Sequence, residues 1–121
     1  EEKLSQGEPS ILSNQSHLTA RDVAQAANNQ DAVAMAALER AGTYLGIALA
    51  NYLHIFNPSA IILGGGVSLS GQHLLDPMNK AMREQVISEQ YLQDLTLTNA
   101  ALGDDAGLMG ALAFAQSIAN I

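Results

Sequence analysis

The spacing of apolar residues predicts two helices in the first half of the chain. Apolar residues recur three and four positions apart between Asp31 and Phe56, which is the period of one helix face. The positions on this face are Val33, Leu38, Ala41, Leu45, Ala48, Leu49, Tyr52, Ile55 and Phe56. A shorter helix is expected from Thr19 to about Ala27. Thr19 and Asp31 are the expected N-caps, because their side-chain oxygens can accept from the free N–H groups of a first helical turn.

The second half of the chain predicts two strands joined by a helix. The continuous apolar run from Ala60 to Leu63 is typical of a strand that is buried on both faces. From Leu95 to Thr98, apolar leucines alternate with β-branched threonines, which predicts a second strand. A helix from about Pro77 to Ser88 lies between them, so the strands should pair in parallel. The sequence leaves open whether Pro77 starts this helix or kinks a longer one.

A last helix is expected after the second strand, with Asp104 as its N-cap. Its apolar face would consist of Leu108, Leu112, Ala115 and Ile118. The polar stretch 89–94 is expected to lead from the helix to the second strand. The predicted order is helix, helix, strand, helix, strand, helix, an α/β arrangement that is rich in helix.

Three consecutive glycines, Gly64, Gly65 and Gly66, follow the first predicted strand. Glycine backbone can adopt positive φ, and without a Cβ it lets a ligand approach closely. In open parallel sheets, ligands bind just beyond the carboxyl ends of the strands. The triplet is therefore a candidate ligand loop, although a plain tight turn explains most such triplets taken alone.

The length of the chain and the number of predicted strands limit its possible domain organisation. The 121 residues suit one domain, but two strands are too few for a stable sheet between helical layers. The chain also begins with Glu1 rather than Met. We expect residues 1–121 to be a single piece of a larger α/β domain. Within it, 1–17 would be a loosely ordered lead and 18–121 would carry the helices and the two parallel strands.

Composition excludes several functional classes. The formal net charge is −7 with only five Lys and Arg residues, which argues against nucleic-acid binding by this chain. There is no cysteine, so disulfides, thiol catalysis and cysteine-based zinc sites are excluded here. No apolar run approaches the roughly 18 residues that span a bilayer, and no signal peptide is evident. These features favour a cytoplasmic protein without a membrane partner.

Four stretches carry a resemblance to a known family. In chain order they are LGIALAN at 45–51, FNPSAIILGGGVS at 56–68, Gly71 with LLDP at 74–77, and ALGDDAGLMGA at 101–111. Together they resemble the C-terminal third of ROK-family proteins. That family comprises bacterial sugar kinases, typified by glucokinase and fructokinase, and sugar-responsive repressors. The resemblance runs in order from about Leu18 to Ala115.

The resemblance implies an actin-like ATPase fold with two ribonuclease-H-like halves, of which this chain would supply the C-terminal portion. ATP, with Mg in the intact enzyme, would lie between the halves and donate its γ-phosphoryl group to a hexose hydroxyl. Gly64, Gly65, Gly66 and Val67 would then be nucleotide-binding residues. The intact protein would bind a hexose and ATP, and we expect a homo-oligomer, namely a dimer.

Other parts of the family pattern are absent from these residues. They include the Asp-x-Gly-x-Thr phosphate-binding segment, the Asn-Asp pair that supplies the catalytic base, the Glu and His sugar contacts, and the Cys-rich zinc motif. We therefore expect no catalytic residue and no metal ligand in this chain, and no kinase activity from the chain alone. The sugar is not identified by the sequence.

Two alternatives to the kinase stay open. The same fold could belong to a sugar-responsive repressor, which would carry a helix-turn-helix upstream. The retained glycine triplet favours the kinase. A third reading is an isolated interaction domain that dimerises through its long helix and has its sheet edge covered by a partner.

The remaining polar and aromatic residues are interpreted structurally. Asp104 and Asp105 suit a helix start better than a catalytic pair. The histidines are not at metal-ligand spacing and are expected at the surface or in packing; they are His17, His54 and His73. Asn51 is expected to face solvent. Tyr44 and Tyr52 are expected in the core or an interface, and Gly42 and Gly46 at a close helix contact.

Overall fold

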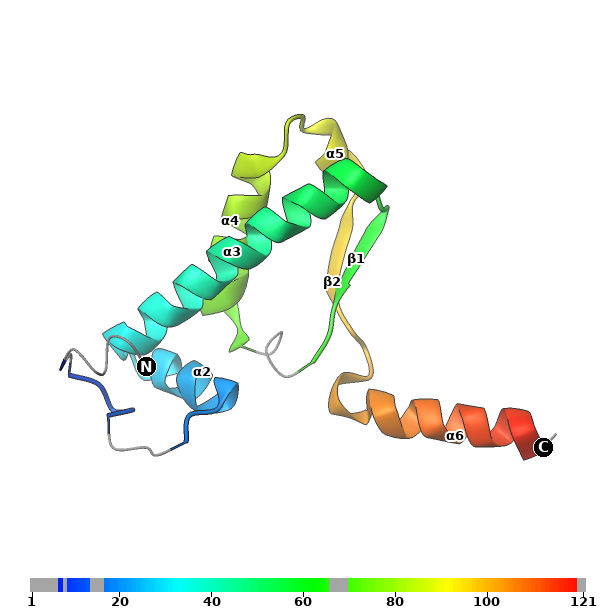
Figure 1. Cartoon of the computed structure of the whole chain (residues 1–121), viewed down its shortest axis with the longest axis horizontal. Helices are drawn as coiled ribbons and strands as arrows, with labels where there is room; N and C mark the ends of the chain where they lie inside the picture. The colour runs from blue at the N-terminus through cyan, green and yellow to red at the C-terminus, as the bar shows by residue number, and fades with distance from the viewer. Residues whose placement is uncertain (1–6, 8, 14–16, 66–69, 120–121) are drawn as a thin grey trace.

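A computed structural model of the chain describes residue 7 and residues 9–13, 17–65 and 70–119, apart from the side chain of Asp104. Within these residues, four longer helices, two strands and two short helical segments follow one another (Figure 1). They are α2 (Ala20–Asn28), α3 (Ala32–Phe56), β1 (Ala60–Leu63), α4 (Gln72–Gln85), α5 (Gln90–Gln93), β2 (Thr96–Asn99), the 3-10 helix η2 (Gly103–Asp105) and α6 (Ala106–Ala119). This is the helix-rich α/β arrangement that the sequence predicts.

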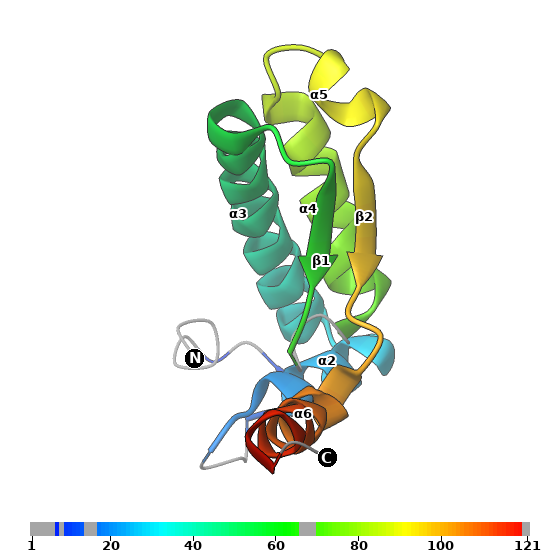
Figure 2. The same ribbon diagram turned by 90° about the vertical axis from the view of Figure 1, so that its right-hand side faces the viewer.

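The two strands form a parallel sheet, as predicted. β1 occupies the expected residues, and β2 begins one residue later than expected. Ala60 pairs with Thr96 and Leu63 pairs with Asn99. Helices α3 and α4 lie together on one side of the sheet (Figure 2). Within the described residues the other side has no cover, since Ile62 is 66% exposed, so burial of β1 on both faces is not observed here.

The core lies between α3, α4 and the sheet. Its fully buried members include Leu53 on α3 and Met78 on α4, with Ile61 and Leu97 of the strands packed against them. A second apolar cluster joins α2 to the start of α3 and includes Leu12 from the segment 9–13. These two clusters hold both ends of α3 against the rest of the chain.

Two glycines bring α3 and α4 into close contact, as predicted. A Cβ added at Gly46 would collide with the Met78 carbonyl oxygen and lie 2.8 Å from the Ala81 Cβ. A Cβ added at Gly42 would collide with the Leu74 carbonyl oxygen and lie 2.9 Å from Pro77 Cγ. Both glycines are buried, so the backbones of the two helices meet where a side chain would otherwise separate them.

Helix α4 differs from its predicted boundaries. It begins at Gln72 rather than Pro77 and ends at Gln85, with Pro77 inside the helix. A proline there removes one i to i−4 hydrogen bond, and packing against α3 offsets that loss. The connection 89–94 also contains the short helix α5, which was not predicted; at four residues it is too short to show an apolar period.

The N-caps of α2 and α3 are those predicted from sequence. Thr19 accepts from the backbone N–H of Asp22, and the Asp22 carboxylate accepts in return from the Thr19 backbone N–H at 2.9 Å, forming a capping box. The Thr19 hydroxyl also donates to the Asp22 carboxylate at 2.6 Å, which is the main cause of the lowered pKa of that carboxyl.

Asp31 joins the N-terminus of α3 to the segment before α2. Its side chain is buried and accepts from the backbone N–H of Ala34 at 2.9 Å and of Ile11 at 2.8 Å. The bond from Ala34 is the main cause that lowers the pKa of the Asp31 carboxyl below its ordinary value of 3.8. The ionised carboxylate therefore stabilises the fold.

We predict that Asp31→Ala lowers the free energy of unfolding by about 2 kcal/mol, because a cap is lost and two N–H groups lose their acceptor. Because the folded pKa is depressed, the stabilisation by Asp31 is complete above pH 3.8 and disappears as the pH falls through the lower folded pKa. Urea unfolding at neutral and acidic pH measures both effects. Asp31→Asn is the control: it keeps an acceptor but should lose this acid dependence, and an unchanged acid dependence would contradict the assignment.

Several apolar side chains that were expected to form buried helix faces are exposed. On α6 none of the described side chains is buried, including Leu108, Leu112 and Ile118 of the predicted face. Helix α6 extends away from the other helices, beyond η2 (Figure 1). On α3, Tyr52, Ile55 and Phe56 are exposed as well, because the sheet and α4 contact a different side of the helix.

Helix α3 is the one described helix that is long and apolar enough to cross a membrane by length and composition. The expectation that no apolar run is long enough to span a bilayer did not anticipate this helix. It is weak evidence for a membrane span, since core helices pass the same test. Here α3 also carries Glu39 and Arg40, and its buried positions pack against α2 and α4.

Candidate functional site

The candidate site is the loop that leaves the carboxyl end of β1. The last residues of the strands, Leu63 and Asn99, are paired, so both strands end at the same edge of the sheet. The Ala100 N–H donates to the Leu63 carbonyl oxygen at 2.7 Å and extends the pairing by one residue. Gly64 and Gly65 follow directly and are exposed. This is the edge at which ligands bind in open parallel sheets.

The two described glycines of the loop have different constraints. A Cβ at Gly64 would meet only the Ala100 Cβ, at an ordinary 3.7 Å. Gly65 has a φ of +81°, which side chains rarely adopt, and a Cβ there would meet nothing within 4 Å. Glycine is therefore required at Gly65 by its backbone conformation and not by neighbouring protein atoms. Gly66 and Val67, the other two predicted binding residues, lie outside the described residues.

The stretch that contains the loop carries no acidic residue of its own. No Asp or Glu occurs from Asn57 to Leu75, although the chain as a whole carries a net charge of −7. The loop leads into α4, whose N-cap Gly71 has a φ of +72° and makes no side-chain capping bond. A strand, a glycine loop and a helix N-terminus in this order place backbone N–H groups and the positive end of a helix dipole near one edge of the sheet.

A small pocket of about 290 Å³ lies beside this edge, between the strand ends and α4. Its lining residues are Leu63, Leu75, Met78, Asn79, Leu97, Thr98 and Asn99. Asn79, Thr98 and Asn99 supply polar groups next to the candidate loop. Sequence reasoning did not single them out. Asn99 could have been found as the polar residue that ends the second strand.

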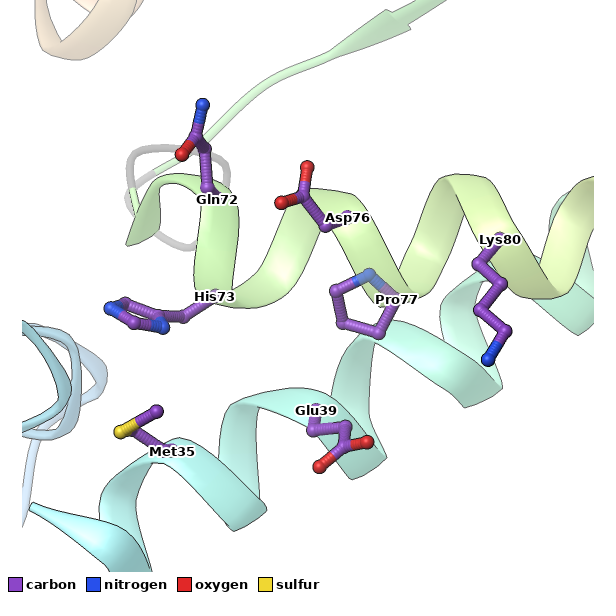
Figure 3. Close-up of a pocket in the computed structure, with 7 residues that line it drawn as sticks. All are labelled: Met35, Glu39, Gln72, His73, Asp76, Pro77 and Lys80. Carbon is purple, nitrogen blue, oxygen red and sulfur yellow. The ribbon is translucent and has the colours of Figure 1, made fainter.

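A larger cavity of about 550 Å³ lies between the N-terminal parts of α3 and α4 (Figure 3). Its lining residues are Met35, Glu39, Gln72, His73, Asp76, Pro77 and Lys80. The Gln72 and Asp76 side chains point away from α3, whereas Glu39 lies on α3 itself (Figure 3). The polar groups of this cavity therefore do not converge on a single point.

Histidine and aspartate residues do not form a catalytic cluster in the described part of the chain. His54 accepts from the Ile87 backbone N–H at 3.1 Å, and its ring lies edge-on to Tyr91 at 5.3 Å, a packing role as predicted. Asp105 is exposed in η2, and the Asp104 side chain falls outside the description. Among the described residues, no group of three or more His, Cys, Asp and Glu could hold a metal ion.

Comparison with family models and curated proteins identifies relatives over most of the chain. The model of the ROK family matches residues 2–118. The chain is 38% identical over 93 residues to a glucokinase of Halalkalibacterium halodurans, covering 77% of this chain and 28% of that protein. It is 32% identical over 101 residues to the xylose repressor of Bacillus subtilis, covering 84% of this chain and 26% of the repressor. The chain thus spans between a quarter and a third of the length of these relatives.

Solved structures give the same picture for the fold. A structure from Cytophaga hutchinsonii assigned as a sugar kinase superposes with a TM-score of 0.81 at 31% identity, covering 95% of this chain and 38% of that one. A ROK family glucokinase from Streptomyces griseus, in complex with glucose and AMPPNP, gives a TM-score of 0.66 at 35% identity, covering 78% of this chain and 30% of that one. The arrangement of helices and parallel strands is therefore that of a portion of these kinases.

Proposed function

The chain belongs to the ROK family, and we propose that it forms the C-terminal, nucleotide-facing part of an ATP-dependent sugar kinase of the glucokinase type. The observation that carries the proposal is the exposed Gly64–Gly65 loop at the carboxyl ends of two parallel strands, with a positive φ at Gly65. Glucokinases of several bacteria are among the relatives, at 31–38% identity. One related glucokinase was solved with an ATP analogue.

In this proposal the loop binds the nucleotide through its backbone. Gly64 and Gly65 present no side chain, so phosphate oxygens can approach the main chain closely. Gly66 and Val67 belong to the same proposed contact. ATP, with Mg, supplies the phosphoryl group that is transferred. Because phosphoryl transfer depends mainly on positioning and on stabilisation of charge, backbone donors suffice as the contribution of this loop.

The substrate proposed for the intact protein is a hexose, glucose in the first instance. Support comes from the Streptomyces griseus relative, which was solved with glucose as well as AMPPNP. The sugar contacts and the catalytic base are proposed to lie in other parts of the protein, so the residues described here orient the nucleotide and do not catalyse. A kinase that uses ATP on a free sugar is proposed to act in the cytoplasm.

The second candidate function is that of a sugar-responsive transcriptional repressor. The 32% identity to a xylose repressor over 84% of the chain supports it, as does a TM-score of 0.74 to a ROK family transcriptional regulator. In that case the same fold would bind a sugar as an inducer, and DNA would be contacted by a segment outside this chain. The glycine loop favours the kinase, although repressors of this family can keep such a triplet.

We predict that the intact protein phosphorylates glucose with ATP, at a turnover of about 1–100 per second that is typical of kinases. A coupled assay of ADP release, with and without glucose, measures it; xylose serves as the comparison sugar. The polypeptide 1–121 alone should give no sugar-dependent ADP. Absence of turnover with every hexose, together with operator binding released by xylose, would reject the kinase in favour of the repressor.

A further inference from the structure

His54, in the last turn of α3, contacts the segment that joins α4 to β2 (Figure 1). Its Nε2 atom accepts from the backbone N–H of Ile87 at 3.1 Å, across a sequence separation of 33 residues. Its ring lies edge-on to the ring of Tyr91 in α5, with 5.3 Å between the ring centres. The connection between α4 and β2, residues 86–95, is therefore bound to the end of α3 at two points through this one histidine.

The hydrogen bond to His54 is made at the residue where the chain leaves α4. The Val86 N–H still donates to the Met82 carbonyl oxygen, as it would within a helix. Val86 itself is extended, with a φ of −69° and a ψ of 135°, so the next N–H, that of Ile87, points to the imidazole instead of a helix carbonyl. Without this acceptor the Ile87 N–H would have to be satisfied by water.

This hydrogen bond requires a neutral imidazole. A backbone N–H can only donate, so the Nε2 atom that it meets carries no proton, and the ring proton lies on Nδ1. A second proton would make Nε2 a donor, and two N–H groups would then face each other. Histidine is the side-chain type that ordinarily changes its charge between about pH 5 and pH 8. The bond is therefore sensitive to mild acid.

The protonated ring has a favourable arrangement of its own. His54 lies in the last turn of α3, where the negative end of the helix dipole and the last carbonyl groups stabilise a cation. The neutral ring favours the connection bound to α3, and the charged ring favours the helix end without that bond. Each protonation state thus stabilises a different arrangement of the same residues, which is the requirement for a switch.

The other charged groups around His54 are of types that do not ordinarily titrate in this range. No Asp, Glu or Lys follows Glu39 on α3, and residues 57–63 have no ionisable side chain. Carboxylates, guanidinium groups and phenols each keep one charge between about pH 5 and pH 8. On the elements packed around His54 these groups belong to Arg40, Tyr44 and Tyr52 of α3, Arg83 and Glu84 of α4, and Glu89, Tyr91 and Asp94 of the connection.

We propose that His54 is an acid-sensitive latch on the connection between α4 and β2. The neutral ring binds the Ile87 N–H and holds the connection on the end of α3. Protonation breaks this bond, while the apolar side chains of the connection, such as Leu92 and Leu95, remain packed against the core. The connection joins α4 to β2, and both elements line the pocket of about 290 Å³ beside the glycine loop. Release of the latch therefore frees α4 and β2 to shift relative to each other at that pocket.

Hydrogen exchange of the Ile87 N–H in the intact protein tests the latch. Isotope-labelled isoleucine makes this amide visible by NMR, and Ile87→Val identifies its signal. The protection factor already corrects for the dependence of exchange itself on pH. We expect it to fall about 5-fold from about pH 8 to about pH 5.5, the factor that corresponds to one ordinary hydrogen bond. The amide of Ile47, in the middle of α3, should keep its protection.

Three variants separate the protonation of His54 from other effects of acid. His54→Gln keeps an acceptor that does not titrate, so Ile87 should stay protected at both pH values. His54→Phe keeps a ring beside Tyr91 but has no acceptor, so the protection should be low at both. His73→Gln removes a histidine that lines the other cavity, and the acid loss should persist.

Four results would each overturn the latch. They are constant protection of Ile87 in the unsubstituted protein, an undiminished acid loss in His54→Gln, full protection in His54→Phe, and a parallel loss at Ile47, which would indicate general unfolding. Disappearance of the acid loss in His73→Gln would also reject it, because the titrating group would then be His73. None of these results depends on whether the protein is a kinase or a repressor.

Discussion

Gly46→Ala is expected to lower the free energy of unfolding by about 3 kcal/mol, at the upper end of overpacking costs. The added Cβ collides with the Met78 carbonyl oxygen and lies within 2.8 Å of the Ala81 Cβ and 2.9 Å of the Met82 backbone nitrogen. None of these atoms is the end of a flexible side chain. Helices α3 and α4 must therefore move apart, and the core around Leu53 and Met78 loses contact.

The sign of the change in the free energy of unfolding distinguishes close helix packing from helix propensity as the dominant effect at Gly46. In an exposed helix Ala is favoured over Gly by about 1 kcal/mol, so propensity alone predicts stabilisation at Gly46. Ala37→Gly, at an exposed position of the same helix, is the reverse control and should cost about 1 kcal/mol. Urea unfolding of the intact protein, followed by circular dichroism, compares the two. If Gly46→Ala is neutral or stabilising, the close approach of the helices is wrong.

Gly65→Val is expected to raise the KM for ATP at least about 10-fold while leaving the KM for glucose nearly unchanged. A β-branched residue at a φ of +81° costs about 1–2 kcal/mol, which the loop avoids by leaving the conformation that faces the nucleotide. The proposed sugar contacts lie elsewhere in the protein, so the sugar should bind as before. Steady-state kinetics with each substrate varied in turn separates the two constants.

Gly65→Asn is the matched control for the Gly65→Val experiment. Asparagine enters the left-handed region more readily than valine, so it should retain more affinity for ATP if backbone conformation is the cause. Equal losses for Asn and Val would point instead to close approach of the phosphates, for which any side chain is too large. A normal KM for ATP in the Val variant would contradict a nucleotide-facing role for the loop.

Local signals in the sequence predicted the elements that local chemistry determines. Thr19 and Asp31 cap their helices as expected, because their side-chain oxygens accept from the free backbone N–H groups of the first helical turn. The strand Ala60–Leu63 was found from its apolar run between Pro58 and the glycines. The parallel pairing followed from the helix between the strands.

The errors arose where tertiary contacts outweigh local preference. At Pro77 the sequence left open a helix start or a kink in a longer helix, and the structure shows one helix that runs through Pro77 from Gln72 to Gln85. The spacing of apolar residues alone did not distinguish the buried side of α3 from the exposed side that carries Tyr44, Tyr52 and Phe56. Tyr44 and Tyr52 are therefore not core residues, and only the interface interpretation of them is still open. Burial depends on neighbours that no single helix encodes.

For the candidate site, sequence identified the glycines and their place at the strand end but not their geometry. The positive φ of Gly65 could not be assigned in advance, because any of three consecutive glycines could have taken it. The polar neighbours Asn79, Thr98 and Asn99 come from two elements that meet only in the fold. The nucleotide-binding role of Gly64, Gly65, Gly66 and Val67 stays a prediction.

The parallel register of β1 and β2 has a consequence for the order of folding. Pairing Ala60 with Thr96 closes a loop that contains all of α4 and α5, and this closure costs chain entropy before any strand contact offsets it. The docking of α4 on α3 closes a loop of nearly the same length, since Gly42 meets Leu74 and Gly46 meets Met78, but it also forms many apolar contacts, so it should come first. Folding of this region is then expected to proceed from the helix pair outward, with strand pairing as a late and slow event.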